Sequence, residues 1–212
     1  MLKMGSLYLL VVGLLAGLAA TAQPARAADQ VRQTSVDQRT VDQKLLPKGQ
    51  WLHGLAWTDA RGANVVTFAA TDKAVKAKPS GQDAEHSRYL QIRHYAAGKL
   101  VREVNDKVER CAFDLTLDLL PGAFAVTDLD GDGQGEVTFG YKMGCRSDVS
   151  PLDLKLLLLE DGAKLILRGS TRVFDGQRHI GGAYKAEPAK ASWPAAFFAH
   201  ADKLWQGVVA EK

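Results

Sequence analysis

Residues 124–141 decide the fold class, and they read Phe-Ala-Val-Thr-Asp-Leu-Asp-Gly-Asp-Gly-Gln-Gly-Glu-Val-Thr-Phe-Gly-Tyr. Acidic residues stand at the alternate positions 128, 130 and 132, and Glu136 follows four residues later. β-Branched and aromatic residues alternate with small or polar ones after this acidic run, and a short apolar segment precedes it. That pattern is typical of strands rather than helices. The stretch therefore predicts two strands joined by a tight acidic loop.

The composition of this loop predicts a calcium site. Ca²⁺ takes roughly six to eight oxygen ligands, and a short loop supplies them only if it curls around the ion. Gly133 permits such a turn through a positive φ. Neighbouring carboxylates also repel one another unless a cation neutralises them. An Asp/Gly turn without an ion and a different divalent metal are the alternatives. The expected ligands are Asp128, Asp130, Asp132, the backbone carbonyl of Gln134, and Glu136 directly or through water.

The loop departs from the EF-hand pattern. Its twelfth position is Phe139 instead of glutamate, its eighth is Gly135, and its flanks are not helical. The loop resembles the calcium loops of FG-GAP or integrin α-subunit propeller repeats, in which the ion ties a hairpin together. Together with residues 144–151, 154–156, 164 and 167–169, it is also similar to a family of exported bacterial proteins, some labelled surface polysaccharide biosynthesis proteins. This resemblance spans about residues 111–173 and implies a role in the cell envelope. We expect the ion to be structural, because a phosphoryl-transfer metal site would have a cluster of Lys or Arg nearby and only Lys142 and Arg146 lie near in sequence.

Outside the loop, the pattern predicts a mainly β (α+β) domain. We expect an antiparallel sheet or a two-sheet sandwich of hairpins, with a C-terminal amphipathic helix. Residues 111–119 alternate most clearly and should place Cys111, Phe113 and Leu115 on the inner face. Residues 154–159 are nearly all leucine, which indicates a strand buried on both faces. The predicted strands are 64–68, 88–96, 100–110, 111–119, 153–160 and 164–173; 51–57 is a strand or packed turn, 71–82 a solvated loop, and 194–210 the helix.

The first 27 residues have the layout of a secretory signal peptide. Lys3 precedes an uncharged apolar run, and Ala25-Arg26-Ala27 offers a cleavage site. A retained membrane anchor is the alternative, although the run is shorter than the roughly 20 residues that span a bilayer. We expect cleavage after Ala27, with Ala22 as the second choice, and a periplasmic or secreted product without a stable membrane span. The remaining chain would be a polar segment, 28–50, and one domain, 51–212.

Cys111 and Cys145 are the only cysteines in the sequence. In an oxidising compartment, two cysteines indicate a disulfide. Two thiols are too few for a tetrahedral zinc site. Free buried thiols are the main alternative, so the pairing of Cys111 with Cys145 is a prediction that depends on export.

Charge excludes one large class of partners. The 212 residues carry 27 Lys and Arg against 24 Asp and Glu, a formal charge of +3 that would fall to +1 on removal of Lys3 and Arg26. A nearly neutral domain has no electrostatic basis for binding nucleic acid. The acidic loop and the resemblance to exported proteins lead us to expect a calcium-stabilised binding or structural domain that recognises envelope polysaccharide or an envelope protein. The alternative is a carbohydrate-active hydrolase that uses Asp148 or Glu136 on envelope glycans.

Overall fold

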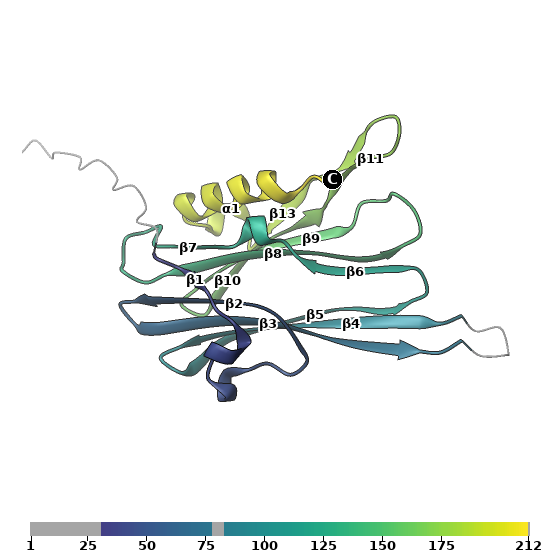
Figure 1. Ribbon diagram of the computed structural model, residues 1–212. Coiled ribbons are helices and arrows are strands. Elements are labelled where there is room, and N and C mark those ends of the chain that lie inside the picture. Colours follow the sequence, from purple (N-terminus) through teal and green to yellow (C-terminus); the bar gives the residue numbers. More distant parts are fainter. Residues whose placement is uncertain (1–30, 78–82, 212) are drawn as a thin grey trace, which may run out of the picture.

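Alternating apolar and polar residues form antiparallel strands along most of the chain. The computed structural model describes residues 31–77 and 83–211, so the expected signal segment 1–27 and its cleavage site lie outside the described residues. The strands form two main sheets that lie face to face, and one helix covers the outer face of the second sheet (Figure 1). This arrangement confirms the predicted mainly β fold with a C-terminal helix.

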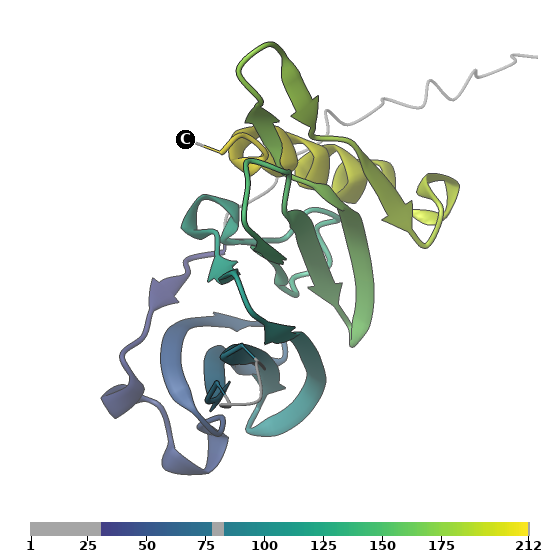
Figure 2. The ribbon, with the colours of Figure 1, turned by 90° about the vertical axis from the view of Figure 1, so that its right-hand side faces the viewer.

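The first sheet has the strand order β1-β2-β3-β4-β5, with every neighbouring pair antiparallel. Figure 2 shows that its strands curl strongly. Residues 31–49, the described part of the polar segment, supply the short edge strand β1 and two 3₁₀ turns, which lie against the outside of this sheet. The bounds are β1 Thr34–Ser35, β2 Gln50–Asp59, β3 Gly62–Val75, β4 Glu85–Ala96 and β5 Lys99–Cys111.

The second sheet has the order β13-β10-β9-β8-β6, and β7 also pairs with β8. The long strand β8 pairs with β7 near its beginning and with β6 near its end. A separate hairpin, β11–β12, projects beyond the sheet (Figure 1). The bounds are β6 Asp114–Leu119, β7 Ala125–Thr127, β8 Glu136–Arg146, β9 Asp153–Glu160, β10 Ala163–Ser170, β11 Arg172–Phe174, β12 His179–Gly181, β13 Tyr184–Glu187 and α1 Ala195–Val208.

The second sheet is buried on both faces. Leu157 and Leu159 of β9 point into a core shared with the first sheet. Leu154, Leu156 and Leu158 point the other way, into a second core beneath α1. This explains why β9 is an almost unbroken leucine run, as predicted. The helix contributes Phe197, Ala201 and Trp205 to the second core, which confirms that the predicted C-terminal helix is amphipathic.

Two predicted segments differ from the structure where the chain changes sheets. Residues 111–119 are not one strand, because β5 ends at Cys111 and β6 begins at Asp114 in the opposite sheet. Cys111 is buried as expected, but the prediction that Phe113 faces inward was wrong, since Phe113 is 63% exposed in the crossover. Residues 164–173 likewise divide into β10 and β11.

The predicted loop at residues 71–82 was partly wrong. β3 continues through Val75, because Thr71 to Val75 pair with Tyr89 to Glu85 of β4 beyond the edge of the core. Within residues 31–77 and 83–211, no helix combines the length and the apolar character that a membrane crossing requires.

Candidate metal centre

The acidic loop lies between two paired strands, as the sequence predicts. β7 ends at Thr127, β8 begins at Glu136, and these two residues pair directly. Gly131 and Gly133 have φ values of 78° and 81°, a region that glycine adopts readily. The predicted positive φ at Gly133 is therefore confirmed, and it lets the loop curl within eight residues, Asp128 to Gly135.

Aspartate side chains shape the curl through hydrogen bonds to backbone amides. Asp128 accepts bonds from the N–H groups of Gly131 and Gly133, at 2.9 and 3.1 Å. The N–H of Asp132 donates to Oδ1 of Asp130 at 3.2 Å, and that of Gln134 donates to Oδ1 of Asp132 at 2.7 Å. Each of these carboxylates therefore accepts a hydrogen bond from the loop's own backbone, while Asp130 and Asp132 remain exposed to solvent.

Glu136 is the most constrained of the predicted ligands. It is fully buried, and its Oε2 accepts hydrogen bonds from the Thr127 hydroxyl at 3.0 Å and the Leu129 N–H at 2.9 Å. Its Oε1 is also buried but has no hydrogen-bond partner. Burial raises the pKa of Glu136 to about 7. A buried carboxylate oxygen without a partner is costly, so this oxygen calls for a cation or a proton.

The carboxylates gather into two overlapping groups. One ligand oxygen from each of Asp128, Asp130 and Glu136 lies within 4.8 Å of the others. A second group, with the same spacing, consists of Asp130, Asp132 and Glu160. Burial, together with the neighbouring charge of Asp130, raises the pKa of Glu160 to about 7. These groups have the oxygen-only donor set that suits a hard divalent cation, and either could hold a metal ion.

Four of these five carboxylates were predicted from the sequence. Asp132 is grouped with Asp130 and Glu160 rather than with Asp128 and Glu136. The side-chain amide of Gln134 donates to the Asp132 carboxylate, and its predicted role as a carbonyl ligand stays a prediction. Glu160 was missed, because it lies 24 positions beyond Glu136 in the sequence and reaches the loop only through strand pairing. The sequence feature that could have drawn attention to Glu160 was the Asp161-Gly162 turn that follows it, because this turn places Glu160 at the end of a strand.

The loop is also attached to the first sheet, at the β2–β3 hairpin. Asp59 accepts hydrogen bonds from the Gly135 N–H at 3.0 Å and from the Trp57 indole at 2.9 Å. Burial alone would raise the pKa of Asp59, but these bonds lower it. The Ala60 N–H donates to the Gly133 carbonyl at 2.8 Å. The acidic loop is therefore part of the contact between the two sheets.

Gly135 has to be glycine for this contact. A Cβ atom at Gly135 would lie 2.6 Å from the Trp57 indole nitrogen, which is too close for any side chain. An EF-hand carries a large apolar residue at this eighth position. Here Trp57 of the opposite sheet occupies that space.

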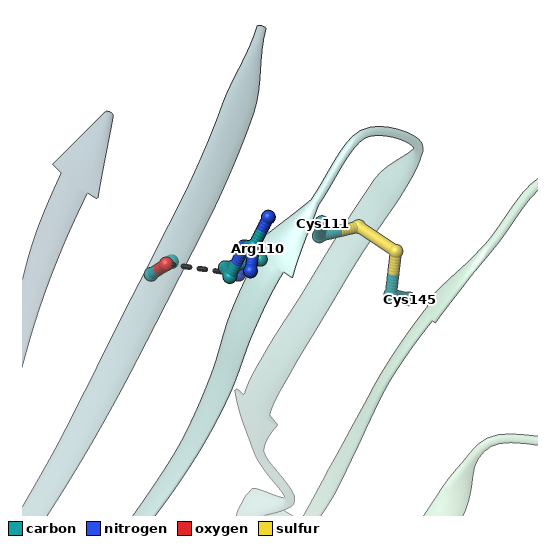
Figure 3. Close-up of a disulfide and its surroundings, with 4 residues drawn as sticks. Arg110, Cys111 and Cys145 are labelled. Carbon is teal, nitrogen blue, oxygen red and sulfur yellow. Dashed lines mark hydrogen bonds between the residues drawn. A yellow bond between two sulfur atoms is a disulfide. The ribbon is translucent and has the colours of Figure 1, made fainter. Parts of the chain in front are cut away.

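The predicted disulfide joins the two sheets near the other end of β8. Cys111, the last residue of β5, is bonded to Cys145 near the end of β8, with 5.5 Å between their Cα atoms (Figure 3). Arg110 precedes it with a φ of 55°, at an irregularity in the β4–β5 pairing, and its N–H donates to the Ser87 hydroxyl at 3.0 Å. This bulge turns the chain out of the first sheet at the residue that forms the bridge.

No family model matches this chain, and no curated protein or solved structure matches it either. Support for a function therefore comes from the described residues alone.

Proposed function

We propose that this chain is a calcium-stabilised β domain, in which the ion fixes the acidic loop and thereby the contact between the two sheets. The observation that carries the proposal is the unpartnered Oε1 of the fully buried Glu136, in a side chain grouped within 4.8 Å of Asp128 and Asp130. A cation at this position would satisfy that oxygen and neutralise the surrounding carboxylates.

Calcium is favoured over magnesium by the kind of ligands present. Magnesium demands nearly ideal octahedral geometry and retains several waters, whereas calcium accepts many oxygen ligands in a flexible arrangement. The loop offers several carboxylates from one curled segment, and softer ligands, Cys or His, are absent from both groups. The ion would supply positive charge and coordination to this segment, and its role would be structural.

Calorimetry and thermal melting test this function. Protein freed of metal by chelation should bind Ca²⁺ with measurable heat, and Mg²⁺ much more weakly. At a free calcium concentration about 100 times Kd, binding contributes about 2.7 kcal/mol, which corresponds to a rise in Tm of roughly 5–10 °C. Asp130→Asn should abolish the rise, while Asp118→Asn, at an exposed carboxylate on β6, should preserve it. Absence of heat and of any Tm shift in the unmodified protein would refute the function.

The domain is also proposed to be exported, with envelope polysaccharide as its ligand. The Cys111–Cys145 disulfide supports an oxidising compartment. A cavity of about 460 Å³ supports a binding role, since Tyr89, Gln91, Asn105 and Lys107 line it on β4 and β5. The Gln91 side-chain oxygen is buried there without a partner, so a ligand hydroxyl would satisfy it.

Glycan binding is testable with defined polymers. Affinity electrophoresis in gels that contain polygalacturonate or dextran should show retardation of the protein in at least one of them. Gln91→Ala should lose that retardation, and Gln177→Ala, in the distant β11–β12 hairpin, should keep it. If the unmodified protein migrates in both polymers as it does in a polymer-free gel, polysaccharide binding is refuted, and the calcium proposal is unaffected.

The hydrolase alternative has less support from the same side chains. Glu136 is fully buried, so it has no surface with which to reach a glycan. Asp148 is exposed and accepts a hydrogen bond from the Ser150 N–H at 2.8 Å, and its bonds with Ser150 lower its pKa. A glycosidase acid needs a raised pKa and a second carboxyl across a cleft. Asp148 therefore lacks the properties of that acid.

A further inference from the structure

Glu160 lies at the end of β9, next to the acidic loop but outside it in sequence. The register of β8 and β9 pairs Val137 with Leu159, and both side chains point into the core between the sheets. Continuing this register by one residue places Glu160 opposite Glu136, on the same face of the sheet. One oxygen of Glu160 lies within 4.8 Å of ligand oxygens of Asp130 and Asp132.

Two glutamates at opposed positions of neighbouring strands are destabilising unless something neutralises them. The charge of Arg61 offsets only part of the rise in the pKa of Glu160, and Arg61 forms its ion pair with Asp161 rather than with Glu160. Two groups of three carboxylates, which share Asp130, therefore lie at this end of the strands. The fully buried Glu136 belongs to one group and has an oxygen without a hydrogen-bond partner, and Glu160 belongs to the other. Both observations are explained by a cation that Glu160 also contacts.

We propose that Glu160 is a ligand of the calcium ion, and that it supplies from β9 the carboxylate that the loop itself lacks at its twelfth position. Phe139 stands at that position and cannot serve, because it is buried in the core and packs against Phe68 at 5.3 Å between ring centroids. This inference rests on the proposed calcium function. It makes the ion a link between the loop and the β9–β10 hairpin.

The ion would then act at a junction of three segments. Asp161, next to Glu160, pairs with Arg61 of the β2–β3 turn, and the same turn binds Gly133 through Ala60. The acidic loop, the β9–β10 turn and the β2–β3 turn therefore meet at one place. Loss of the Glu160 carboxylate should weaken calcium binding without breaking any hydrogen bond within the loop.

The test compares Glu160→Gln with Glu187→Gln, a glutamate that ends β13 and pairs with Arg168. By calcium calorimetry, Glu160→Gln should raise Kd at least about tenfold, since calcium affinity depends on the number of charged ligands. Glu187→Gln should leave Kd within about twofold. In excess chelator, Glu160→Gln should melt at the same temperature as the unmodified protein or higher, because it removes a repulsive charge.

The outcomes separate the two proposals. If the unmodified protein binds no calcium, the proposed function fails. If it binds calcium and Glu160→Gln binds it equally well, only the role of Glu160 is overturned. A chelated Glu160→Gln protein that melts well below the chelated unmodified protein would also overturn it, because Glu160 would then stabilise the fold without the ion.

Discussion

The backbone N–H of Gly135 donates a hydrogen bond of 3.0 Å to the carboxylate of Asp59, across the boundary between the two sheets. Asp59 thereby connects a hairpin turn of the first sheet to the acidic loop of the second. Because Asp59 also binds the Trp57 indole, a single carboxylate fixes both the loop and the side chain that packs against it.

Asp59→Ala should destabilise the domain. The substitution leaves the Gly135 N–H and the Trp57 indole N–H without their acceptor, and a buried donor that loses its partner costs about 1–3 kcal/mol. Urea denaturation should show a loss of about 2 kcal/mol or more, together with weaker calcium binding. Asp118→Ala, at an exposed aspartate on β6, should change neither quantity.

Gly135→Ala should destabilise the domain more than the same substitution at a glycine that has open space around it. The new methyl group would meet the Trp57 indole, and overpacking of this kind costs about 1–3 kcal/mol. Gly207→Ala is the control, because no atom lies within 4 Å of its Cβ position in α1, and alanine favours a helix. In thermal melting, Tm should fall for Gly135→Ala and should stay the same or rise for Gly207→Ala.

Removal of the disulfide should cost stability mainly through the unfolded state. Cys111 and Cys145 are 34 residues apart, so in the chain-entropy model their bond contributes about 3–4 kcal/mol. The Cys111→Ala, Cys145→Ala double variant should lose that amount in urea denaturation under oxidising conditions. Under reducing conditions, the unmodified protein should fall to nearly the same value. Unchanged stability in both comparisons would contradict this assignment.

His94 should make stability depend on pH between about 6.5 and 4. Burial lowers its pKa from 6.5 to about 4 in the folded protein, where it bonds to Asn64 at 3.1 Å. As the pH falls below 6.5, His94 becomes protonated in the unfolded chain but stays neutral in the folded protein. The free energy of unfolding therefore decreases until the pH reaches about 4. The full loss is about 3 kcal/mol at the conversion of 1.36 kcal/mol per pKa unit.

The test of His94 compares the free energy of unfolding of two proteins over the same pH range. Unfolding free energies of the unmodified protein and His94→Gln, both in excess calcium, should converge as the pH falls from 7 to 4. Subtraction cancels the carboxyl groups that titrate in the same range.

Local patterns predicted the features of this molecule that depend on neighbours in sequence. The leucine run of β9, the α1 stripe and the positive φ at Gly133 all follow from spacing within a few residues. The disulfide also followed, because only two cysteines were available. Features that depend on which strands pair could not be predicted from spacing within a few residues.

Glu160 and Phe113 illustrate that limit. Glu160 joins the acidic group only because β9 is the neighbour of β8, and alternation does not reveal the neighbour of a strand. Phe113 continues the alternation of residues 111–119, yet it is exposed because the chain leaves one sheet for the other at that point. Arg146 likewise pairs with Glu211 near the C-terminus, a contact between residues 65 positions apart that no local pattern reveals.

Strand β8 begins at the acidic loop and carries Cys145 near its end, so it is fastened to the first sheet at both extremities. Its middle is fastened as well, where the Tyr141 hydroxyl donates to Asp106 of β5 at 2.8 Å. Two sheets separate under the smallest force when contacts can break one after another from a free strand end. Neither end of β8 is free, so a force that pulls the sheets apart must break several attachments at once.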